Sequence, residues 1–323
     1  MSKAIRMHAV GGPDVLKWET VPKPQAGPGD VLIHHEAVGL NYIDVYFRNG
    51  LYKSALPATP GMEGAGIVLA VGEGVIDFVP GDRVAYAGGP IGAYATERVL
   101  SADRLVKLPD GIDFVTGAAM MLQGMTAQYL LRRTFKVQKG QTILIHAAAG
   151  GVGLIMCQWA RHLGATVIGV VSTEEKARLA EENGAHHIII GHGTLAAEVK
   201  KLTHGAMVPV VYDSVGKDTF SLSLDCLAPL GMMVSYGSAS GPVPPVDITT
   251  LTTKGSLFLT RPSLATYTAT HGDLLAVTAE LFDVVMSGVV KIQVNQTFPL
   301  AEAAAAHEAL EARKTTGSTV LLP

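Results

Sequence analysis

The spacing of hydrophobic and polar positions changes near residue 142. From there onward, short β-branched runs alternate with longer helical patterns, which is typical of βαβ units that build a parallel sheet. The strands predicted from this alternation are 142–146, 166–171, 187–190, 208–212, 233–236 and 256–259. Six strands with intervening helices are the number found in a complete doubly wound α/β domain, a Rossmann domain.

Residues 1–125 show a different pattern, with short alternating segments punctuated by Gly and Pro, which is typical of a compact β-rich domain. Helical patterns at 274–286 and 301–313 and a strand pattern at 318–322 close the chain. This tail has no partner of its own for its apolar faces, so we expect it to rejoin the first domain. The predicted organisation is therefore a β-rich domain at 1–125, a Rossmann domain at 126–262 and a returning segment at 263–323. Ligands bind preferentially at such domain interfaces.

Charge and composition narrow the classes of partner. The 25 Lys+Arg and 28 Asp+Glu residues give a formal net charge of -3, which gives no electrostatic reason to expect a nucleic acid or an anionic membrane as the main partner. No apolar run reaches the ~20 residues of a membrane span, and the N-terminus lacks a secretion signal. The two cysteines, Cys157 and Cys226, form no CxxC pair. We therefore expect a cytoplasmic protein.

The strongest chemical signal is the glycine-rich loop between the strand 142–146 and the following apolar helix. It is a variant of GxGxxG in which Ala148 takes the first glycine position and Gly150 and Gly153 take the others. Glycine at 150 allows close approach of a pyrophosphate, and glycine at 153 allows the helix to pack tightly on the strand. The N–H groups at the helix N-terminus then face the phosphates. This pattern predicts a dinucleotide site.

The end of the second strand indicates which dinucleotide binds. An NAD-specific domain places Asp or Glu here to bind the ribose, but this chain has Val171 followed by Ser172 and Thr173. Without that carboxylate a 2′-phosphate is not repelled, and Lys176 in the next helix can pair with it. Ser172 and Glu175 predict a capping box at the start of that helix. The pattern favours NADPH; the alternative is that Lys176 is one cation on a solvated face.

The histidines do not predict a metal site. The adjacent pairs His34-His35 and His186-His187 point to opposite faces of a strand and cannot share a metal, and no cysteine cluster accompanies them. His271 and His307 are unaccompanied in the sequence. We therefore interpret these histidines as structural or exposed.

The chain resembles a known family over essentially its whole length. The segments that carry the resemblance are Gly39–Asp44, Pro60–Gly66, Ala147–Gly153, Tyr212–Gly216 and the closing His307–Pro323. They are similar to the NADPH-dependent quinone oxidoreductases, which belong to the zinc-free branch of the medium-chain dehydrogenase/reductase superfamily and are related to zeta-crystallin. The resemblance implies a GroES-like fold for the β-rich catalytic domain and a homodimer.

Three positions relate the chain to the rest of that superfamily. Zinc-dependent relatives have a Cys ligand near Asn41 and a His ligand at Met62, and this sequence has neither. Close relatives place a tyrosine beside the adenosine phosphate, where this chain has Gly191 followed by His192.

Carried over by position, the resemblance also implies a set of site residues. Asn41 and Tyr46 would lie at the nicotinamide end, where a flat quinone would stack. Tyr46 or Tyr52 is a candidate proton donor, although a tyrosine in such a site more commonly only packs. The cofactor contacts implied are Asn41, Tyr46, Thr126, Gly150, Gly151, Val152, Gly153, Ser172, Lys176, Ser214, Gly216, Tyr236, Ser238 and Arg313.

The function predicted from these features is transfer of reducing equivalents from NADPH to small quinones without a metal. One alternative is reduction of an activated C=C bond in an enal or enone, which uses the same hydride geometry but needs a proton at the α carbon. An alternative of another class is an NADPH-loaded structural or RNA-binding protein like zeta-crystallin. The balanced charge and the lack of an aromatic-basic stripe argue against RNA as the main partner.

Overall fold

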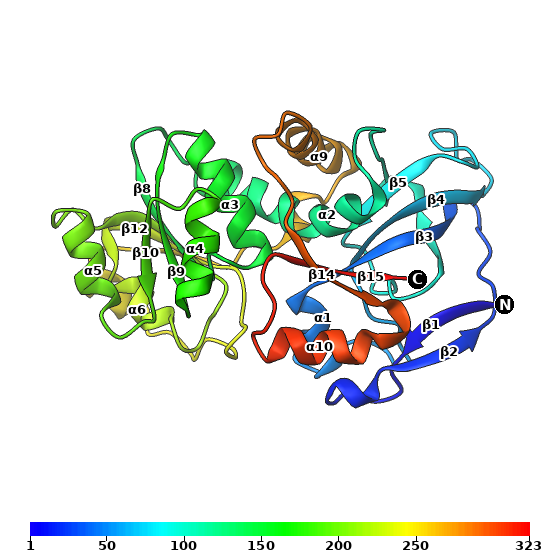
Figure 1. Cartoon of the computed structure of the whole chain (residues 1–323), viewed down its shortest axis with the longest axis horizontal. Coiled ribbons are helices and arrows are strands. Elements are labelled where there is room, and N and C mark those ends of the chain that lie inside the picture. Colours follow the sequence, from blue (N-terminus) through cyan, green and yellow to red (C-terminus); the bar gives the residue numbers. More distant parts are fainter. The chain divides into compact units, whose positions relative to one another are not determined.

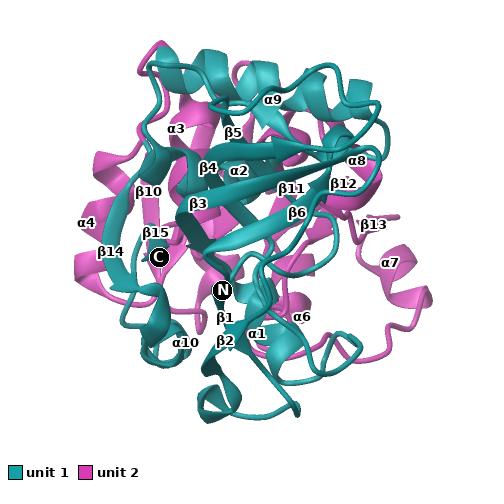
Figure 2. Ribbon diagram, turned by 90° about the vertical axis from the view of Figure 1, so that its right-hand side faces the viewer, with its two compact units in different colours: residues 1–125, 268–286, 292–323 teal, residues 126–267, 287–291 magenta.

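The computed structural model describes all 323 residues and divides into two compact units, coloured separately in Figure 2. Unit 1 consists of residues 1–125, 268–286 and 292–323, and unit 2 of residues 126–267 and 287–291. None of the helices has the length and apolar character needed to span a membrane.

Unit 2 is built on a six-stranded sheet in the order β10-β9-β8-β11-β12-β13, and every neighbouring pair in it is parallel. Its strands are β8 (Thr142–His146), β9 (Thr166–Val171), β10 (His187–Ile190), β11 (Val208–Asp213), β12 (Leu227–Ser235) and β13 (Phe258–Thr260). The strand order runs outward in both directions from the β8–β11 pair. In such sheets the carboxyl ends of the strands beside this switch point form the ligand site.

Helices cover the two faces of this sheet (Figure 1). They are α3 (Gly151–His162), α4 (Glu174–Glu182), α5 (Leu195–Leu202) and α6 (Phe220–Leu224), followed by the short α7 (Thr249–Thr253) and α8 (Leu264–Tyr267). Leu144 and Ile168 face α5 and α6 and pack with Leu195 and Phe220 in one buried cluster. Ile143 and Ile145, at the alternate positions of β8, are also fully buried, so both faces of this strand are apolar, as burial on two sides requires.

Unit 1 contains a seven-stranded sheet in the order β14-β15-β3-β4-β5-β7, with β6 paired to β3, and a separate β1–β2 pair. Its strands are β1 (Ser2–Arg6), β2 (Lys17–Val21), β3 (Asp30–Leu40), β4 (Glu63–Val71), β5 (Arg83–Ala87), β6 (Glu97–Ser101), β7 (Val106–Lys107), β14 (Val294–Pro299) and β15 (Ser318–Leu322). The C-terminal strands β14 and β15 thus extend the sheet formed by the first hundred residues.

The helices of unit 1 are α1 (Tyr42–Arg48), α9 (His271–Met286) and α10 (Ala303–Glu311), with short turns η1 (Pro13–Val15), η2 (Ala102–Arg104) and η4 (Leu300–Glu302). α2 (Phe114–Tyr129) begins in unit 1, and its residues from Thr126 belong to unit 2, where a π-helical turn, η3 (Leu130–Thr134), follows.

The predicted Rossmann sheet is confirmed, while several element ends differ from prediction. β12 begins at Leu227 rather than 233, because Leu227 already pairs with Val208 of β11, and after a register shift the pairing resumes at Met232. β13 begins at Phe258 rather than 256, because Ser256 has a φ of 56° and cannot be extended. α10 ends at Glu311, and Arg313 lies beyond it with a φ of 58°.

Candidate functional site

The glycine loop joins β8 to α3 through a tight turn. Gly150 is the N-terminal cap of α3, and its N–H donates to the Ala147 carbonyl (2.9 Å). A side chain at Gly153 would overlap that same carbonyl oxygen, so only glycine lets the helix approach the loop this closely. The first N–H groups of α3 have no acceptor within the helix, so they can donate to an anionic ligand. These groups belong to Gly151, Val152 and Gly153.

The loop variant depends on a residue that was not predicted from the sequence, Gly169 of β9. Ala148 stands where the usual pattern has glycine, and its methyl group is fully buried. It packs over Gly169 of the neighbouring strand β9, where a Cβ would lie only 2.9 Å from the Ala148 Cβ. A glycine in β9 thus compensates for the alanine in the loop.

The end of β9 carries the residues predicted to select the nucleotide. Ser172 is exposed, and α4 begins after Thr173, whose Oγ1 accepts a hydrogen bond from the Lys176 N–H (3.3 Å). The capping box predicted on Ser172 is therefore wrong by one residue, because Thr173 and not Ser172 precedes the first helical residue. Lys176 lies in the first turn of α4, and the strand end holds no carboxylate before Glu174.

Gly191 lies beside this strand end, since its N–H donates to the Val171 carbonyl (2.8 Å). Its φ is 80°, and no atom lies within 4 Å of the place where a Cβ would stand. A side chain at this position would therefore point into open space next to the end of β9.

The loop after β11 is held by a buried carboxylate that the sequence analysis did not select. Asp213 accepts hydrogen bonds from the N–H groups of Val215 (2.8 Å) and Gly216 (3.1 Å) and from the Thr219 hydroxyl (2.7 Å). Gly216 has a φ of 94°, and a Cβ on it would lie 2.7 Å from a carbonyl oxygen. Asp213 thus fixes the backbone that carries the predicted contacts Ser214 and Gly216.

The loop after β12 carries Tyr236 and Ser238. The Tyr236 N–H donates to the Asp213 carbonyl (2.8 Å), and its hydroxyl is hydrogen-bonded to Ser214. Arg261 donates to the Gly237 carbonyl (2.7 Å) and to the Ser238 hydroxyl (3.3 Å). Arg261 is thus a second organising residue that the sequence analysis missed.

Thr126 lies in the last turn of α2, where it is buried and hydrogen-bonded to the side chain of Tyr129. The Tyr129 ring stacks on Tyr267 with centroids 4.5 Å apart and planes 4° from parallel. Burial raises the pKa of Tyr129, so it stays neutral over the ordinary pH range.

In unit 1, Asn41 caps the N-terminus of α1 and is buried. Its Nδ2 donates to the Glu63 carboxylate (2.5 Å), its Oδ1 accepts from Gln123 Nε2 (3.1 Å), and its backbone N–H donates to Asp44 Oδ2 (2.9 Å). Burial raises the pKa of Glu63 to about 8 and that of Asp44 to about 7. Both ends of the Asn41 amide are therefore engaged by protein groups.

The two candidate proton donors lie in an aromatic cluster on and after α1. Tyr46 packs against Tyr42 with ring centroids 5.7 Å apart and against Tyr52 at 5.3 Å. The Tyr52 ring also meets Phe47 edge-on at 5.6 Å, and its N–H donates to the Tyr46 carbonyl (2.9 Å). The structure thus brings Tyr46 and Tyr52 together.

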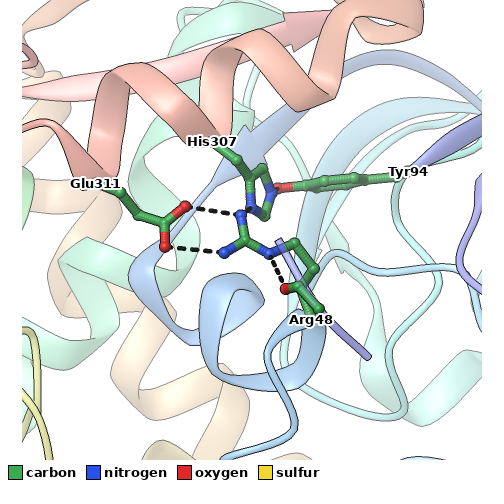
Figure 3. A network of polar contacts seen from close by, with 5 residues as sticks. Arg48, Tyr94, His307 and Glu311 are labelled. Atoms are coloured by element: carbon green, nitrogen blue, oxygen red, sulfur yellow. Dashed lines mark hydrogen bonds and ion pairs between the residues drawn. The ribbon is translucent and has the colours of Figure 1, made fainter. Parts of the chain in front are cut away.

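A buried network connects α1 to α10 (Figure 3). Arg48 forms two hydrogen bonds with the Glu311 carboxylate (2.7 and 2.8 Å) and donates to His307 Nδ1 (3.3 Å). Because Nδ1 accepts, the proton of His307 is on Nε2, which faces the Tyr94 hydroxyl (3.0 Å), and Tyr94 then donates to Asp44 (3.0 Å). Burial lowers the pKa of His307 to about 3.

Arg313, the last predicted cofactor contact, follows α10 and is exposed. Its N–H donates to the Leu310 carbonyl (3.0 Å). Arg313 thus follows directly after the helix that the network between α1 and α10 holds in place.

The structure thus gathers the predicted residues in two groups. Those of unit 2 lie at the carboxyl ends of β8, β9, β11 and β12 and in the last turn of α2. In unit 1, Asn41, Tyr46 and Tyr52 lie on and beside α1, and Arg313 follows α10. Their binding roles stay predictions.

Two of the histidines considered for a metal site, His35 and His307, have structural partners. His35 donates from Nδ1 to the Ala95 carbonyl (2.6 Å), and its Nε2 accepts from the Tyr86 hydroxyl (2.8 Å). His307, which has no companion in the sequence, is buried in the network described above. Nowhere do three His, Cys, Asp or Glu side chains gather in a way that could hold a metal ion.

Comparisons with known proteins agree with this architecture. Residues 27–110 match the alcohol dehydrogenase GroES-like domain, and residues 151–296 match the zinc-binding dehydrogenase family. A GroES-like domain joined to a six-stranded Rossmann domain defines a medium-chain dehydrogenase/reductase.

Full-length relatives specify the family. A quinone oxidoreductase from Pseudomonas aeruginosa is 54% identical, with 100% of each chain covered. A 2-haloacrylate reductase from a Burkholderia species is 48% identical over 100% of this chain and 99% of its own. The crystal structure of Escherichia coli quinone oxidoreductase complexed with NADPH superposes with a TM-score of 0.97 at 44% identity, covering 100% of each chain. The chain belongs to the quinone oxidoreductase family.

Proposed function

We propose that this protein is an NADPH-dependent quinone reductase, an enzyme that transfers reducing equivalents from NADPH to small quinones. The observation that carries the proposal is the 54% identity to a quinone oxidoreductase over the whole of both chains. The Escherichia coli relative, whose fold this chain shares at a TM-score of 0.97, was solved with NADPH.

The residues of unit 2 fit a dinucleotide phosphate. The missing side chain at Gly153 seats α3 against the loop, and the N–H groups from Gly151 to Gly153 would hold the pyrophosphate. Ser172 and Lys176 would hold the 2′-phosphate beside a strand end that lacks a carboxylate. The open space at Gly191 leaves this phosphate subsite without the tyrosine of close relatives.

Two further residues hold the loops that carry other predicted contacts. Asp213 fixes the loop of Ser214 and Gly216, and Arg261 fixes the loop of Ser238. Thr126, Val152, Tyr236 and Arg313 would complete the contacts. Preorganisation of this kind lowers the entropic cost of binding.

When bound, NADPH supplies a hydride to the acceptor, and with one proton this converts a quinone to a hydroquinone. The protein's part is to orient the acceptor and exclude water. Asn41 and the ring of Tyr46 would orient a flat acceptor, with Tyr46 packed by Tyr42 and Tyr52. The proton would come from water or from the hydroxyl of Tyr46 or Tyr52.

A steady-state assay tests the proposal. We expect NADPH to be oxidised with 1,4-benzoquinone and with 9,10-phenanthrenequinone. Failure to oxidise NADPH with either quinone, in protein that binds NADPH, would overturn it.

A second candidate function is NADPH-dependent reduction of an activated C=C bond. It is favoured by the 48% identity to a 2-haloacrylate reductase, again over the whole chain. This reaction places a proton on the carbon next to the activating group, so it depends more strongly on a protein acid than quinone reduction does.

A homodimer through the edge of the unit 2 sheet is part of the proposal. β13 is an edge strand with exposed Phe258 and Leu259, and such edges pair readily with another strand. Light scattering measures the expected mass, which is about twice that of the chain. The buried free thiols Cys157 and Cys226 fit the proposed reducing cytoplasm.

A further inference from the structure

The Asn41 amide is hydrogen-bonded to a buried carboxyl group that faces no cation. Glu63 begins β4 and is fully buried against Gly39 of β3, where any Cβ would overlap its carboxylate. Its Oε1 accepts from Asn41 Nδ2 (2.5 Å), and its Oε2 accepts from the Leu122 N–H of α2 (2.6 Å).

From Asn41 the hydrogen bonds continue in one direction. Asn41 Oδ1 accepts from Gln123 Nε2 (3.1 Å), and Gln123 Oε1 accepts from the Ser318 hydroxyl (2.7 Å). The same Ser318 hydroxyl lies 3.2 Å from the Ala119 carbonyl oxygen, a second acceptor. All donors in this chain point toward Glu63, which is the arrangement that an ionised carboxylate requires.

The donors of this hydrogen-bond chain can also point in the opposite direction, away from Glu63. A neutral Glu63 must keep Oε2 as an acceptor, because the Leu122 N–H is a fixed donor, so its proton is on Oε1. That proton can bond only to Asn41 Oδ1, which requires the amides of Asn41 and Gln123 to turn over. Ser318 then accepts from Gln123 and donates to the Ala119 carbonyl, so the groups of this hydrogen-bond chain remain bonded. The Asp44 N–H, which the Asn41 side chain also caps, keeps its hydrogen bond to the Asn41 carbonyl (3.0 Å).

We propose that Glu63 is a positioning residue of the reaction site, which sets the direction of the Asn41 amide through this reversible hydrogen-bond chain. Ionised Glu63 holds the amide nitrogen of Asn41, and neutral Glu63 holds the amide oxygen. The inference rests on the proposed function only in assigning Asn41 to the acceptor end of the site.

The electrostatic surroundings place this change within the working range of pH. Burial raises the pKa of Glu63 to about 8, the hydrogen bonds from Asn41 and Leu122 oppose that rise, and the charge of Asp44 adds to it. Glu63 is therefore mostly ionised above that pH and mostly neutral below it. The other titratable groups that interact with it are Tyr86 and Tyr94, which stay neutral. Arg98 lies one hydrogen bond farther away, on the Tyr86 hydroxyl (3.0 Å).

Glu63→Gln separates a positioning role from a structural one. Its Oε1 must face the Leu122 N–H, so its amide nitrogen faces Asn41 and locks the reversed chain. We expect kcat/KM for quinone reduction to change about tenfold, equivalent to about 1.4 kcal/mol, between low and high pH in the wild type. In Glu63→Gln it should stay at the low-pH value throughout, with normal thermal unfolding.

Asp44→Asn is the matched control, because Asp44 is the other buried carboxyl group and its pKa is also raised, to about 7. This variant should retain the change of kcat/KM with pH. The midpoint should lie at lower pH, because one negative charge beside Glu63 is gone. If Asp44→Asn loses the pH dependence of kcat/KM and Glu63→Gln keeps it, the assignment of this dependence to Glu63 is overturned.

A readout that needs no turnover keeps this test apart from that of the proposed function. Side-chain amide NMR signals of Asn41 and Gln123 should shift with pH in the wild type, with one common midpoint, and should not do so in Glu63→Gln. If these signals shift but no quinone is reduced, only the proposed function fails. If quinone is reduced and the signals do not shift, the inference about Glu63 fails. If Glu63→Gln does not fold, the wild-type and Asp44→Asn signals decide.

Discussion

At the scale of the residue, we propose that the choice of nucleotide depends on Lys176 and on the absence of a carboxylate at the end of β9. The end of β9 has Val171 and Ser172 where a carboxylate would bind an unphosphorylated ribose. The Thr173 cap fixes the first turn of α4 and so fixes the backbone that carries Lys176. A single local cation can then decide between two cofactors that differ by one phosphate group.

Replacing Lys176 should weaken the binding of NADPH and leave the binding of NADH unchanged. We expect Lys176→Ala to raise the KM for NADPH about tenfold, the loss of about 1.4 kcal/mol, because one charge-assisted contact with the 2′-phosphate disappears. Steady-state kinetics with both nucleotides measure this. Arg178→Ala, on an exposed position of the same helix, is the control and should change neither KM. An equal rise in both KM values would contradict the role given to Lys176.

Residues with local requirements could be predicted from the sequence, and residues with distant partners could not. Gly153 is fixed by its contact with a loop only six positions away. Glu63, by contrast, meets Asn41, which is 22 residues away, and the Leu122 N–H, which is 59 residues away. Arg261 shows the same limit, because only the fold places it beside the loop of Ser238.

At the scale of the element, α1 and α10 are joined by one buried ion pair. Arg48 is 2% exposed and Glu311 is 34% exposed, so the guanidinium depends for its hydrogen bonds on this carboxylate, on His307 Nδ1 (3.3 Å) and on the Gly11 carbonyl (3.1 Å) (Figure 3). The pair therefore fixes the position of α10, and with it the start of the Arg313 segment, relative to the helix of Tyr46.

Neutralising Glu311 should loosen this connection. We expect Glu311→Gln to lower the free energy of unfolding by about 2 kcal/mol, below the ~3 to 5 kcal/mol of a fully buried pair, because water reaches Glu311 in part. Urea denaturation measures it. Glu308→Gln, exposed on the same helix, should stay within about 0.5 kcal/mol of the wild type. A Glu311→Gln variant as stable as the control would show that the pair contributes nothing.

Element ends were harder to predict than element types, for a reason visible in the backbone. The strand patterns at β8, β9 and β10 are bounded by loops whose residues cannot extend them, and their predicted limits match the structure. β13 was predicted to start two residues too early, because the left-handed conformation of Ser256 has no signal in a β-branched pattern.

At the scale of the whole molecule, the chain alternates between its two units. Residues 268–286 and 292–323 belong to the same unit as residues 1–125, and β15 pairs with β3. The net charge of -3 gives no hint of the site, because the charges on which our proposals rest are local: one lysine, one buried glutamate and a helix terminus. Similarity over the full length of the relatives, rather than any single motif, specifies the family.

The most direct test of the central claim is a competition between two acceptors in the full-length protein. Wild-type enzyme with limiting NADPH is given equal concentrations of 1,4-benzoquinone and 2-chloroacrylate, and the products are quantified. We predict that hydroquinone accounts for nearly all of the NADPH consumed. Saturated chloropropionate as the main product would contradict the account and assign the protein to C=C reduction.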